Sequence, residues 1–393
     1  MDFINKICRG DRVIWMVFLF LCIISIVEVY SASSTLTFHT DYWQPISRHI
    51  MFLLMGWGLV LITHSIPPRY FSLLGFFLPI IFLLLLAARF LGNSINNSYR
   101  WIDVVGISFQ PSEMAKLSLI VFTSFLLSKK NSDNEKKIFY WILIVMGGVC
   151  AVIFLDNGST AIMLAGIIYL MMFIGQISVR RMLILSSEIV FLGAVFYYTI
   201  KYVPYNYLDG IFPRIKTWEA RFIDFKVSID LSNSNFAITD DNYQIAHANI
   251  AVSNGQILGK GLGNSSERDF LPQAYSDFIY AIIIEETGLI GGLVVLLLYI
   301  VLFIRVGVIA KCSKKLFSMF MVMGIALALV IQALANMAVA VNLIPVTGQT
   351  LPLISRGGTS TLINCICFGI ILSVSRYETI QGNEQEEKII IHI

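Results

Sequence analysis

Ten apolar runs divide the chain, and each is close to the length that a helix needs to cross a lipid bilayer. They fall at 13–34, 48–66, 70–91, 109–128, 138–155, 158–176, 182–203, 277–304, 317–342 and 358–376. At 1.5 Å per residue, about 20 residues cover a hydrocarbon core of about 30 Å. Of 393 residues, 57% are hydrophobic and only 13% are charged, against about 25% charged in soluble domains. We therefore expect an all-α polytopic membrane protein, a single domain over 1–393 with about ten transmembrane helices.

Lysine and arginine are distributed unevenly between the two sets of connecting segments. Ten spans put both termini on one side, and the segments on that side hold most of the 28 basic residues. The positive-inside rule then places both termini in the cytoplasm. The long segment 204–276, between the seventh and eighth spans, faces outward, and 381–393 is expected to be a disordered cytoplasmic tail. The net charge of +3 gives no reason to expect a nucleic-acid partner.

An ionisable pair opens the fourth span, in the sequence FQPSEMAK at 109–116. Pro111 suits the first position of a helix, where its missing N–H is not needed. Glu113 and Lys116 are three residues apart, so they share a helix face and can pair. One interpretation is a structural ion pair within the bundle. The other is a polar cavity open to the outer side, because ionisable residues inside a membrane commonly have a function.

Three acids occur in LPQAYSDFIYAIIIEETG, residues 271–288, which opens the eighth span. Asp277 lies near the start of the helix, where the macrodipole stabilises its anion, and it is either a candidate general base or a helix cap. Glu285 and Glu286 follow at roughly 80° and 180° around the helix from Asp277, at about 100° per residue. They cannot both join Asp277 in one site. We expect one or both to face neighbouring helices, where they cap backbone groups or pair with Lys or Arg.

The segment IPVTGQTLPLISRGGTS, residues 344–360, connects the last two spans and is too rich in Gly, Pro, Ser and Thr for a lipid-exposed helix. Irregular backbone at membrane depth is tolerated where it lines a cavity. Gly357 and Gly358 allow close approach of a backbone, and Arg356 offers a planar guanidinium suited to phosphate. The alternative is a re-entrant loop with a purely structural role.

From the residues alone, these motifs predict an outward-facing cavity at the membrane surface. Mixed charge in such a place suits an anionic, lipid-linked substrate. It equally suits a transporter, whose sites also use broken helices near the midplane. The expected lining of this cavity is Arg100, Glu113, Lys116, Asp277 and Arg356.

Taken together, the motifs resemble the SEDS family (shape, elongation, division and sporulation). The likeness covers nearly the whole chain and is specific in four places. They are RWI with FQPSEMAK, NYQIAHANIAVSNGQILGKGLGNS at 242–265, LPQAYSDFIYAIIIEETGLIGG, and IPVTGQTLPLISRGGTS. The SRGG form within the last motif is closer to the division branch of the family than to the elongation branch.

The resemblance implies peptidoglycan glycosyl transfer on the outer face of the bacterial cytoplasmic membrane during cell division. The implied substrate is lipid II, a disaccharide-pentapeptide on undecaprenyl diphosphate, and the implied partners are a class B penicillin-binding protein and other division proteins. The family's essential Asp falls on Asp277, expected to be the general base of an inverting transfer, and the Arg of its long loop falls on Arg221. The substrate-binding residues are then expected to be Arg100, Glu113, Lys116, Arg221, Ser355, Arg356, Gly357 and Gly358.

One departure from the family concerns metal binding. Where the family has Glu-Pro-Asp-Phe-Gly-Thr-Ala after the fifth span, this chain has LDNGSTA at 155–161, with Asn157 in place of the Asp and Asp156 one position earlier. A divalent cation, Mg or Mn, held by Asp277 or Asp156, is therefore left open as a cofactor. No organic cofactor is expected.

Two other functions also stay open. A lipid II flippase would use the same cavity and lipid specificity. It would also need an inward-opening polar route, and the cytoplasmic halves of the spans are mostly apolar. A division scaffold that recruits a transpeptidase would not need Asp277 once its partner is present.

Overall fold

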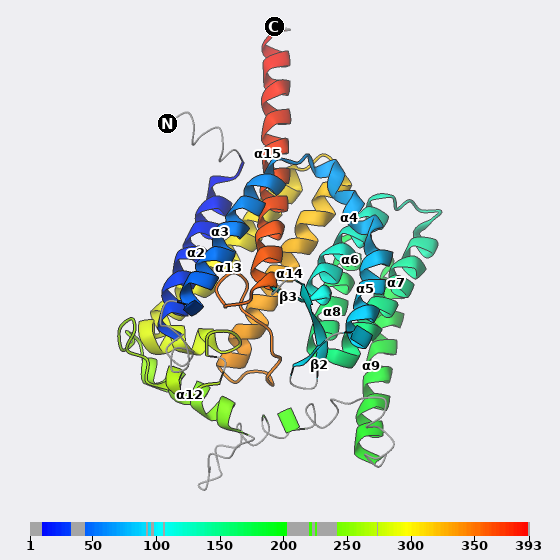
Figure 1. The fold of residues 1–393 in the computed structure, drawn as a ribbon. Helices are drawn as coiled ribbons and strands as arrows, with labels where there is room; N and C mark the ends of the chain where they lie inside the picture. The colour runs from blue at the N-terminus through cyan, green and yellow to red at the C-terminus, as the bar shows by residue number, and fades with distance from the viewer. Residues whose placement is uncertain are drawn as a thin grey trace.

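The structure is a computed structural model that describes residues 10–32, 44–91, 93–95, 98–104, 107–202, 220–221, 225, 242–272 and 274–391. Within these ranges the chain forms a bundle of long helices with one small sheet (Figure 1). Most of the segment 204–276 before residue 242 lies outside the described residues. The elements are α2 (Arg12–Ala32), α3 (Gln44–Ser65), the 3-10 helix η2 (Pro68–Phe71), α4 (Ser72–Phe76), α5 (Leu78–Leu91), β1 (Asn93–Ile95), β2 (Ser98–Val104), β3 (Ile107–Phe109), α6 (Pro111–Ser128), α7 (Glu135–Asp156), α8 (Gly158–Ile174), α9 (Val179–Tyr202), α12 (Tyr243–Gly255), the 3-10 helix η3 (Glu267–Asp269), α13 (Ile279–Cys312), α14 (Leu316–Ala340) and α15 (Thr359–Ile391).

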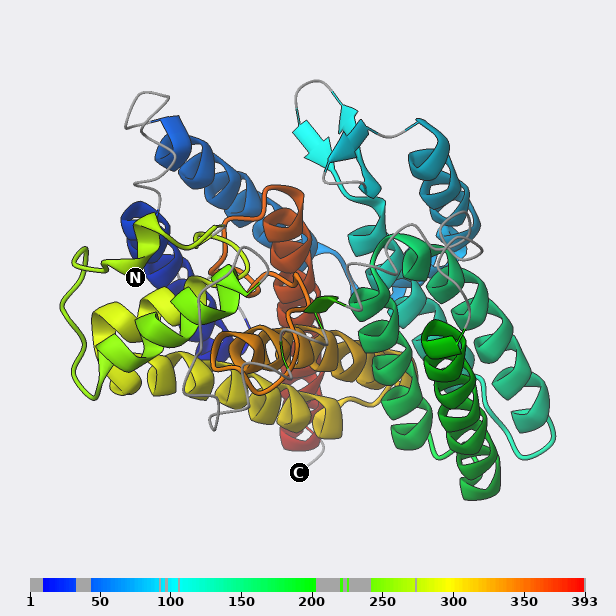
Figure 2. The ribbon, with the colours of Figure 1, turned by 90° about the horizontal axis from the view of Figure 1, so that it is seen from below.

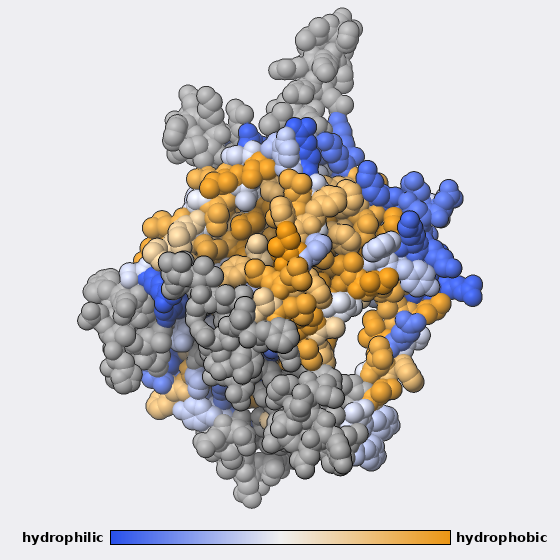
Figure 3. All heavy atoms as spheres, turned by 45° about the vertical axis from the view of Figure 1, so that its right-hand side comes forward, coloured by the Kyte–Doolittle hydropathy of each residue, from blue (hydrophilic) through white to orange (hydrophobic). Residues whose placement is uncertain are grey.

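Helix occupies each of the ten apolar runs that the sequence marks. Over the described part of the chain, seven helices are long and apolar enough to cross a membrane, or eight if Pro68–Phe76 and Leu78–Ala88, bent by 47°, are one span. α8 is apolar but has 17 residues, and α6 carries an ion pair, so the count of ten stays a prediction. Figure 3 shows apolar side chains covering the flank of the bundle, with hydrophilic side chains gathered toward its ends.

The all-α fold class is confirmed, with one small sheet added in the connection between α5 and α6. Three short strands form an antiparallel sheet there, in the order β1-β2-β3, with Ile102 opposite Phe109 and Val104 opposite Ile107. Aromatic and β-branched residues favour strands, and this segment contains several of them. Pro111 follows and occupies the first position of α6, because proline is disfavoured inside a helix. The sheet therefore replaces helix just outside the fourth span.

The prediction of a disordered tail is wrong for the described residues. α15 continues without a break from Thr359 to Ile391, so 381–391 is helical and projects beyond the bundle (Figure 1). Its Glu- and Lys-containing sequence has good helix formers, and the helix is already nucleated inside the bundle.

α14 lies at the centre of the bundle. It contacts α6 and α8 on one side and α13 and α15 on the other, as the view in Figure 2 shows. α9 lies at the edge, with only 12% of its apolar window buried, against 72% for α14. The segment 341–358, here called the α14–α15 loop, returns from the end of α14 to the start of α15 on the same face as α12 (Figure 1).

The helix α13 is broken near its start. Gly288 has φ 74° and ψ −176°, so residues 279–287 and 289–312 are two helical pieces that meet at this residue. Such a conformation is essentially restricted to glycine. The sequence ETGLIGG gives no sign of where the break falls, and the predicted single span 277–304 is therefore replaced by a short helix followed by a long one that ends at Cys312.

Candidate active site

Asp277 lies in a turn that precedes α13, in a partly exposed position. The helix begins at Ile279 and its N-cap position is taken by Phe278. Asp277 is therefore not part of the helix, and the angles predicted between it and the two glutamates do not apply. The hydroxyl of Ser276 donates a hydrogen bond of 3.2 Å to Oδ1 of Asp277. A carboxylate in this position is accessible to a ligand while its backbone stays anchored in the bundle.

Arg221 and Asp277 flank the same glycine of the α14–α15 loop. A Cβ atom added to Gly348 would lie 3.6 Å from Oδ2 of Asp277 and 3.9 Å from Nη2 of Arg221. Gly348 has φ +66°, so glycine both adopts this turn and leaves room for the two charged groups. The structure thus brings together the acid of the eighth span and the arginine of the long outer segment, two residues that the family resemblance implies.

Glu113 and Lys116 form the ion pair that their spacing predicts. Their charged atoms are 2.8 Å apart, and both side chains are 7% exposed. Lys116 Nζ also donates to Oε1 of Gln332 on α14 at 2.7 Å. Both members of the pair line a small cavity of about 10 Å³ between α6, α14 and α15. The ion pair is confirmed, and its functional role stays a prediction beside the structural one.

The α14–α15 loop is fixed to the turn before α13 through Ser355 and Arg356. Ser355 Oγ donates to the carbonyl of Ser276 at 2.6 Å and accepts from the N–H of Leu351 at 2.7 Å. The backbone N–H of Arg356 donates to the carbonyl of Tyr275 at 3.0 Å. The Ser355 hydroxyl is thus engaged by the backbone, so the structure gives it a positioning role for the Asp277 turn.

The Arg356 guanidinium lies at the outer end of the same turn. Its carbon is 5.4 Å from the centre of the Tyr275 ring. Burial lowers the pKa of Arg356, and the nearby charge of Arg48 lowers it further. Arg356 is followed by Gly357 and Gly358, which directly precede α15. This arrangement suits an anionic group.

The remaining predicted residues lie elsewhere. Arg100 is in β2, and its side chain lies outside the described residues. Asp156 is the last residue of α7, and Asn157 caps α8 by accepting from the N–H of Thr160 at 3.3 Å. Asp156 and Asn157 border a pocket with Pro111 and Ser112.

A divalent cation has no ready-made site in the described residues, where no group of three or more His, Cys, Asp or Glu side chains could hold one. Asp277 is one candidate ligand, and Mg²⁺ commonly completes its coordination with water and substrate phosphate. The residues present do not form a binding site by themselves, and the cation stays a prediction.

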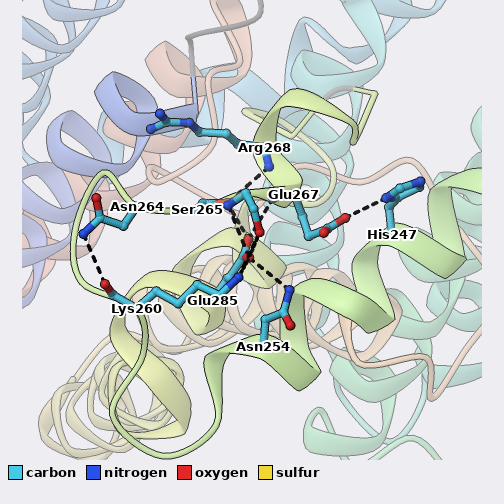
Figure 4. A network of polar contacts seen from close by, with 9 residues as sticks. His247, Asn254, Lys260, Asn264, Ser265, Glu267, Arg268 and Glu285 are labelled. Atoms are coloured by element: carbon cyan, nitrogen blue, oxygen red, sulfur yellow. Dashed lines mark hydrogen bonds and ion pairs between the residues drawn. The ribbon is translucent and has the colours of Figure 1, made fainter.

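Glu285 holds the glycine-rich segment 256–266 against α13, as Figure 4 shows. Its side chain is fully buried, and Lys260 Nζ lies 2.8 Å from its Oε1. This confirms the expected pairing with a basic residue, although the partner comes from a loop and not from a helix. Glu285 also accepts hydrogen bonds from Asn254 Nδ2, Ser265 Oγ, the N–H and Oγ of Ser266 and the N–H of Glu267.

Glu286 performs a related task on the other side of the same helix. It is 1% exposed, accepts from the N–H of Gly263 at 3.0 Å, and accepts from Ser31 Oγ of α2. Arg268 links the same two partners, donating to the carbonyl of Gly263 at 2.9 Å and to Ser31 Oγ at 3.2 Å. Glu286 therefore joins the glycine-rich segment to the end of α2.

The glycine-rich segment also supplies the backbone hydrogen bonds that the break in α13 leaves unmade. The N–H groups of Lys260 and Gly261 donate to the carbonyls of Glu285 and Glu286, each at 2.9 Å. In return, the N–H of Leu289 donates to the carbonyl of residue 256 at 3.0 Å. Buried backbone groups need such partners, so loop and broken helix form one unit.

Two functional candidates were missed by sequence reasoning, Gln332 and Asn336 on α14. Both are buried, at 2% and 1% exposure. Asn336 Nδ2 donates to the carbonyl of Asp277 at 2.8 Å and to that of Gln349 at 2.7 Å. A usable signal was present, because two amides one helical turn apart interrupt an otherwise apolar span, and polar groups inside a membrane helix must find partners.

The fold and the site together define a polytopic membrane protein with a charged cluster at the mouth of its helix bundle. Residues 11–380 match the FtsW/RodA/SpoVE family, described as cell cycle protein. The chain belongs to this family, which confirms the SEDS resemblance inferred from the motifs.

Relatives include two proteins named "Probable peptidoglycan glycosyltransferase FtsW". The one from Enterococcus hirae is 28% identical, with 97% of this chain and 96% of the relative covered. The one from Taylorella equigenitalis is 32% identical, with 84% of this chain and 87% of the relative covered. The likeness therefore extends along nearly the full length of both chains.

Solved structures share the fold. A chain of the structure reported as "Structural coordination of polymerization and crosslinking by a peptidoglycan synthase complex" superposes with a TM-score of 0.71 at 21% identity, covering 94% of this chain and 98% of that one. The rod shape determining protein RodA of Thermus thermophilus gives a TM-score of 0.65 at 20% identity, covering 93% and 97%. The broken and bent helices described above thus belong to a RodA-like fold.

Proposed function

We propose that this chain is a peptidoglycan glycosyltransferase that polymerises lipid II during cell division, with Asp277 as the general base. The names of its relatives support the reaction. The observation that carries the proposal is the cluster at Gly348, where the carboxylate of Asp277 and the guanidinium of Arg221 flank one glycine in a partly exposed position. A base beside a cation is what transfer to a hydroxyl from a diphosphate donor requires.

In the proposed reaction, Asp277 takes the proton from the 4-hydroxyl of the acceptor sugar. The oxygen attacks the anomeric carbon of the donor from the face opposite the diphosphate. The new bond is β-1,4, the bond from the anomeric carbon to the diphosphate oxygen breaks, and undecaprenyl diphosphate leaves. Because the α-linked donor gives a β-linked product, the configuration inverts. Diphosphate needs no protonating acid, so one carboxylate suffices, in contrast to the pair used by glycoside hydrolases.

The leaving group needs stabilisation of its negative charge. Arg221 is one candidate, because it flanks the same glycine as Asp277. Arg356 and Arg48 form a second cationic group beside the Asp277 turn, and Lys116 is a buried cation in the pocket between α6 and α14. These groups are suited to hold the diphosphates of the two lipid-linked substrates. If a divalent cation takes part, Asp277 and the substrate phosphates would hold it and it would neutralise phosphate charge.

The proposed setting is the bacterial cytoplasmic membrane, with a single transmembrane domain over 1–393 and the site on the outer side. α2 begins and α15 ends at one end of the bundle, opposite α12 (Figure 1), which supports placing both termini in the cytoplasm and the segment 204–276 outside. A class B penicillin-binding protein is the proposed partner, and division membrane proteins the proposed assembly. The likeness to a chain from a peptidoglycan synthase complex supports such a partner.

The test uses the purified chain with its cognate transpeptidase and labelled lipid II, comparing wild type with Asp277→Asn and resolving glycan chains by length. General-base catalysis contributes about 10²–10⁴ in rate, so the variant should lose nearly all polymerisation while keeping its melting temperature. An Asn variant that builds glycan at the wild-type rate contradicts the proposal. If lipid II crosses vesicle membranes and no polymer forms, the chain is a flippase. If the Asp277→Asn variant supports the transpeptidase as well as the wild type does, the chain is a scaffold.

A further inference from the structure

Two amide side chains of α14 connect the charged residues of the site to the α14–α15 loop. Gln332 and Asn336 are four residues apart, so they lie on one face of the helix about 6 Å apart along its axis. Both are almost fully buried. A buried amide without hydrogen bonds destabilises the fold. An apolar residue at either position would avoid that cost in a helix that crosses a membrane.

Each amide has one contact with the loop and one with a charged residue. Gln332 Oε1 accepts from Lys116 Nζ at 2.7 Å, and its Nε2 donates to the carbonyl of Thr350 at 2.9 Å. Asn336 Nδ2 donates to the carbonyl of Asp277 at 2.8 Å and to that of Gln349 at 2.7 Å. The two loop carbonyls belong to consecutive residues, and Gly348, which flanks both Asp277 and Arg221, comes immediately before them.

The orientation of the Asn336 amide follows from its partners. Both are carbonyl oxygens, which only an N–H can satisfy, so Nδ2 must point at them. Oδ1 of Asn336 is buried and accepts no hydrogen bond from the described residues. Asn336 is therefore held as a double donor, and its two hydrogen bonds fix the distance between the Asp277 turn and the loop backbone next to Gly348.

We propose that Asn336 is the positioning residue for Asp277, and that Gln332, one turn earlier, plays the same part for Lys116. This inference rests on the proposed function. Asn336 touches the backbone of Asp277 and not its carboxylate, so it acts through the base. α14 thereby sets the separation of the base, the buried lysine and the loop, which are supplied by segments far apart in the chain. Errors of about 1 Å in such a separation can cost about 10² in rate.

The test is Asn336→Leu, which keeps the branched shape of the side chain and removes both donors. We expect kcat per folded molecule to fall about tenfold to a hundredfold, while KM for lipid II is unchanged because the binding groups remain. Tyr169→Phe is the control, because it removes a partly buried hydrogen bond of 2.8 Å between Tyr169 of α8 and Ser186 of α9, away from the site. The control should keep the wild-type kcat.

A double variant separates positioning from an independent role. If Asn336 acts only through Asp277, Asp277→Asn with Asn336→Leu polymerises no more slowly than Asp277→Asn alone. The inference is overturned if Asn336→Leu keeps the wild-type kcat, or if its kcat falls no further than that of Tyr169→Phe at equal melting temperature. It is also overturned if the double variant polymerises more slowly than Asp277→Asn alone. If Asp277→Asn keeps its full rate, the proposed base is wrong. If Asp277→Asn is inactive and Asn336→Leu is normal, only the positioning role is wrong.

Discussion

The short helix of residues 279–287 has acidic side chains at both ends, and the two ends are built in opposite ways. At its C-terminal end, Glu285 and Glu286 are fully buried and receive hydrogen bonds from neighbouring loop and helix segments. Just before its N-terminal end, Asp277 is partly exposed, and its backbone carbonyl accepts a hydrogen bond from Asn336 of α14. The same residue chemistry thus forms a clamp at one end and, in the proposed function, an accessible base at the other.

What separates the two ends is how the charge is satisfied. A carboxylate that accepts several donors in a closed site is held for structure, because losing it leaves those donors unpaired. A carboxylate with an anchored backbone and an accessible side chain is arranged for chemistry. We therefore expect variants at the N-terminal end to change rate without changing stability, and variants at the C-terminal end to do the reverse.

The largest effect on rate is expected when the carboxylate at each end is replaced, one at a time, by the neutral amide. Asp277→Asn should slow polymerisation by about 10²–10⁴ with the melting temperature unchanged. Glu286→Gln should leave the rate per folded molecule near wild type, because the amide oxygen can still accept from the N–H of Gly263 and the new amide N–H can donate to the Ser31 hydroxyl. Polymerisation assays normalised to folded protein check both. Equal losses of rate in both variants would contradict the division between a structural and a catalytic carboxylate.

Glu285→Ala should cost about 1–3 kcal/mol of stability, because the fully buried carboxylate accepts several hydrogen bonds whose donors would lose their partner. The ion pair itself adds little, because Lys260 is 34% exposed. Lys260 would lose its counter-ion and the N–H of Glu267 its acceptor. Thermal unfolding in detergent measures the loss. Glu135→Ala is the control, since its pair with Arg181 is partly exposed, at 19% and 30%, and such pairs contribute about 1 kcal/mol or less. Equal losses for the two variants would contradict the clamp.

Gly288→Ala should destabilise the protein by about 1–3 kcal/mol for its backbone conformation, and more because the new Cβ would lie 2.1 Å from the carbonyl oxygen of Ile257. Gly263→Ala separates the two causes. Gly263 also has a positive φ, +80°, but no atom lies within 4 Å of an added Cβ, so only the backbone term remains. The difference between the two melting temperatures measures the contribution of close packing between Gly288 and Ile257. Equal melting temperatures would mean that the segment 256–261 is not packed against the break in α13.

The smallest effect is expected far from both ends. Arg305 pairs with Asp11 at 2.5 Å, and the arginine side chain is 42% exposed. Arg305→Ala should cost about 1 kcal/mol, because Asp11, which is 6% exposed, keeps its hydrogen bonds from the N–H groups of Val13 and Ile14. Polymerisation should be unchanged. Thermal unfolding and the glycan assay together check this, and a large loss of rate would show that the opposite end of the bundle also influences the site.

The parts of the fold that local spacing encodes could be predicted from the sequence. The apolar runs locate the helices because each must match the bilayer, and the Glu113–Lys116 pair follows from the i,i+3 geometry. Hydrogen bonds between distant segments could not be predicted, since Lys116 and Gln332 are 216 residues apart and Asp277 and Asn336 are 59 apart. The break at Gly288 escaped for the same reason, because it is stable only with the segment 256–261 in place.

The break in α13 also bears on how the chain enters the membrane. Residues 289–312 alone rise about 36 Å at 1.5 Å per residue, which already exceeds a hydrocarbon core of about 30 Å. Inserting a carboxylate at the centre of a transmembrane segment costs about 2.5–3.5 kcal/mol on biological insertion scales, and this segment has none, with its first charge at Arg305. Residues 289–312 therefore meet the requirement for insertion by themselves, and Asp277, Glu285 and Glu286 lie outside that stretch, so their charge adds nothing to its insertion cost.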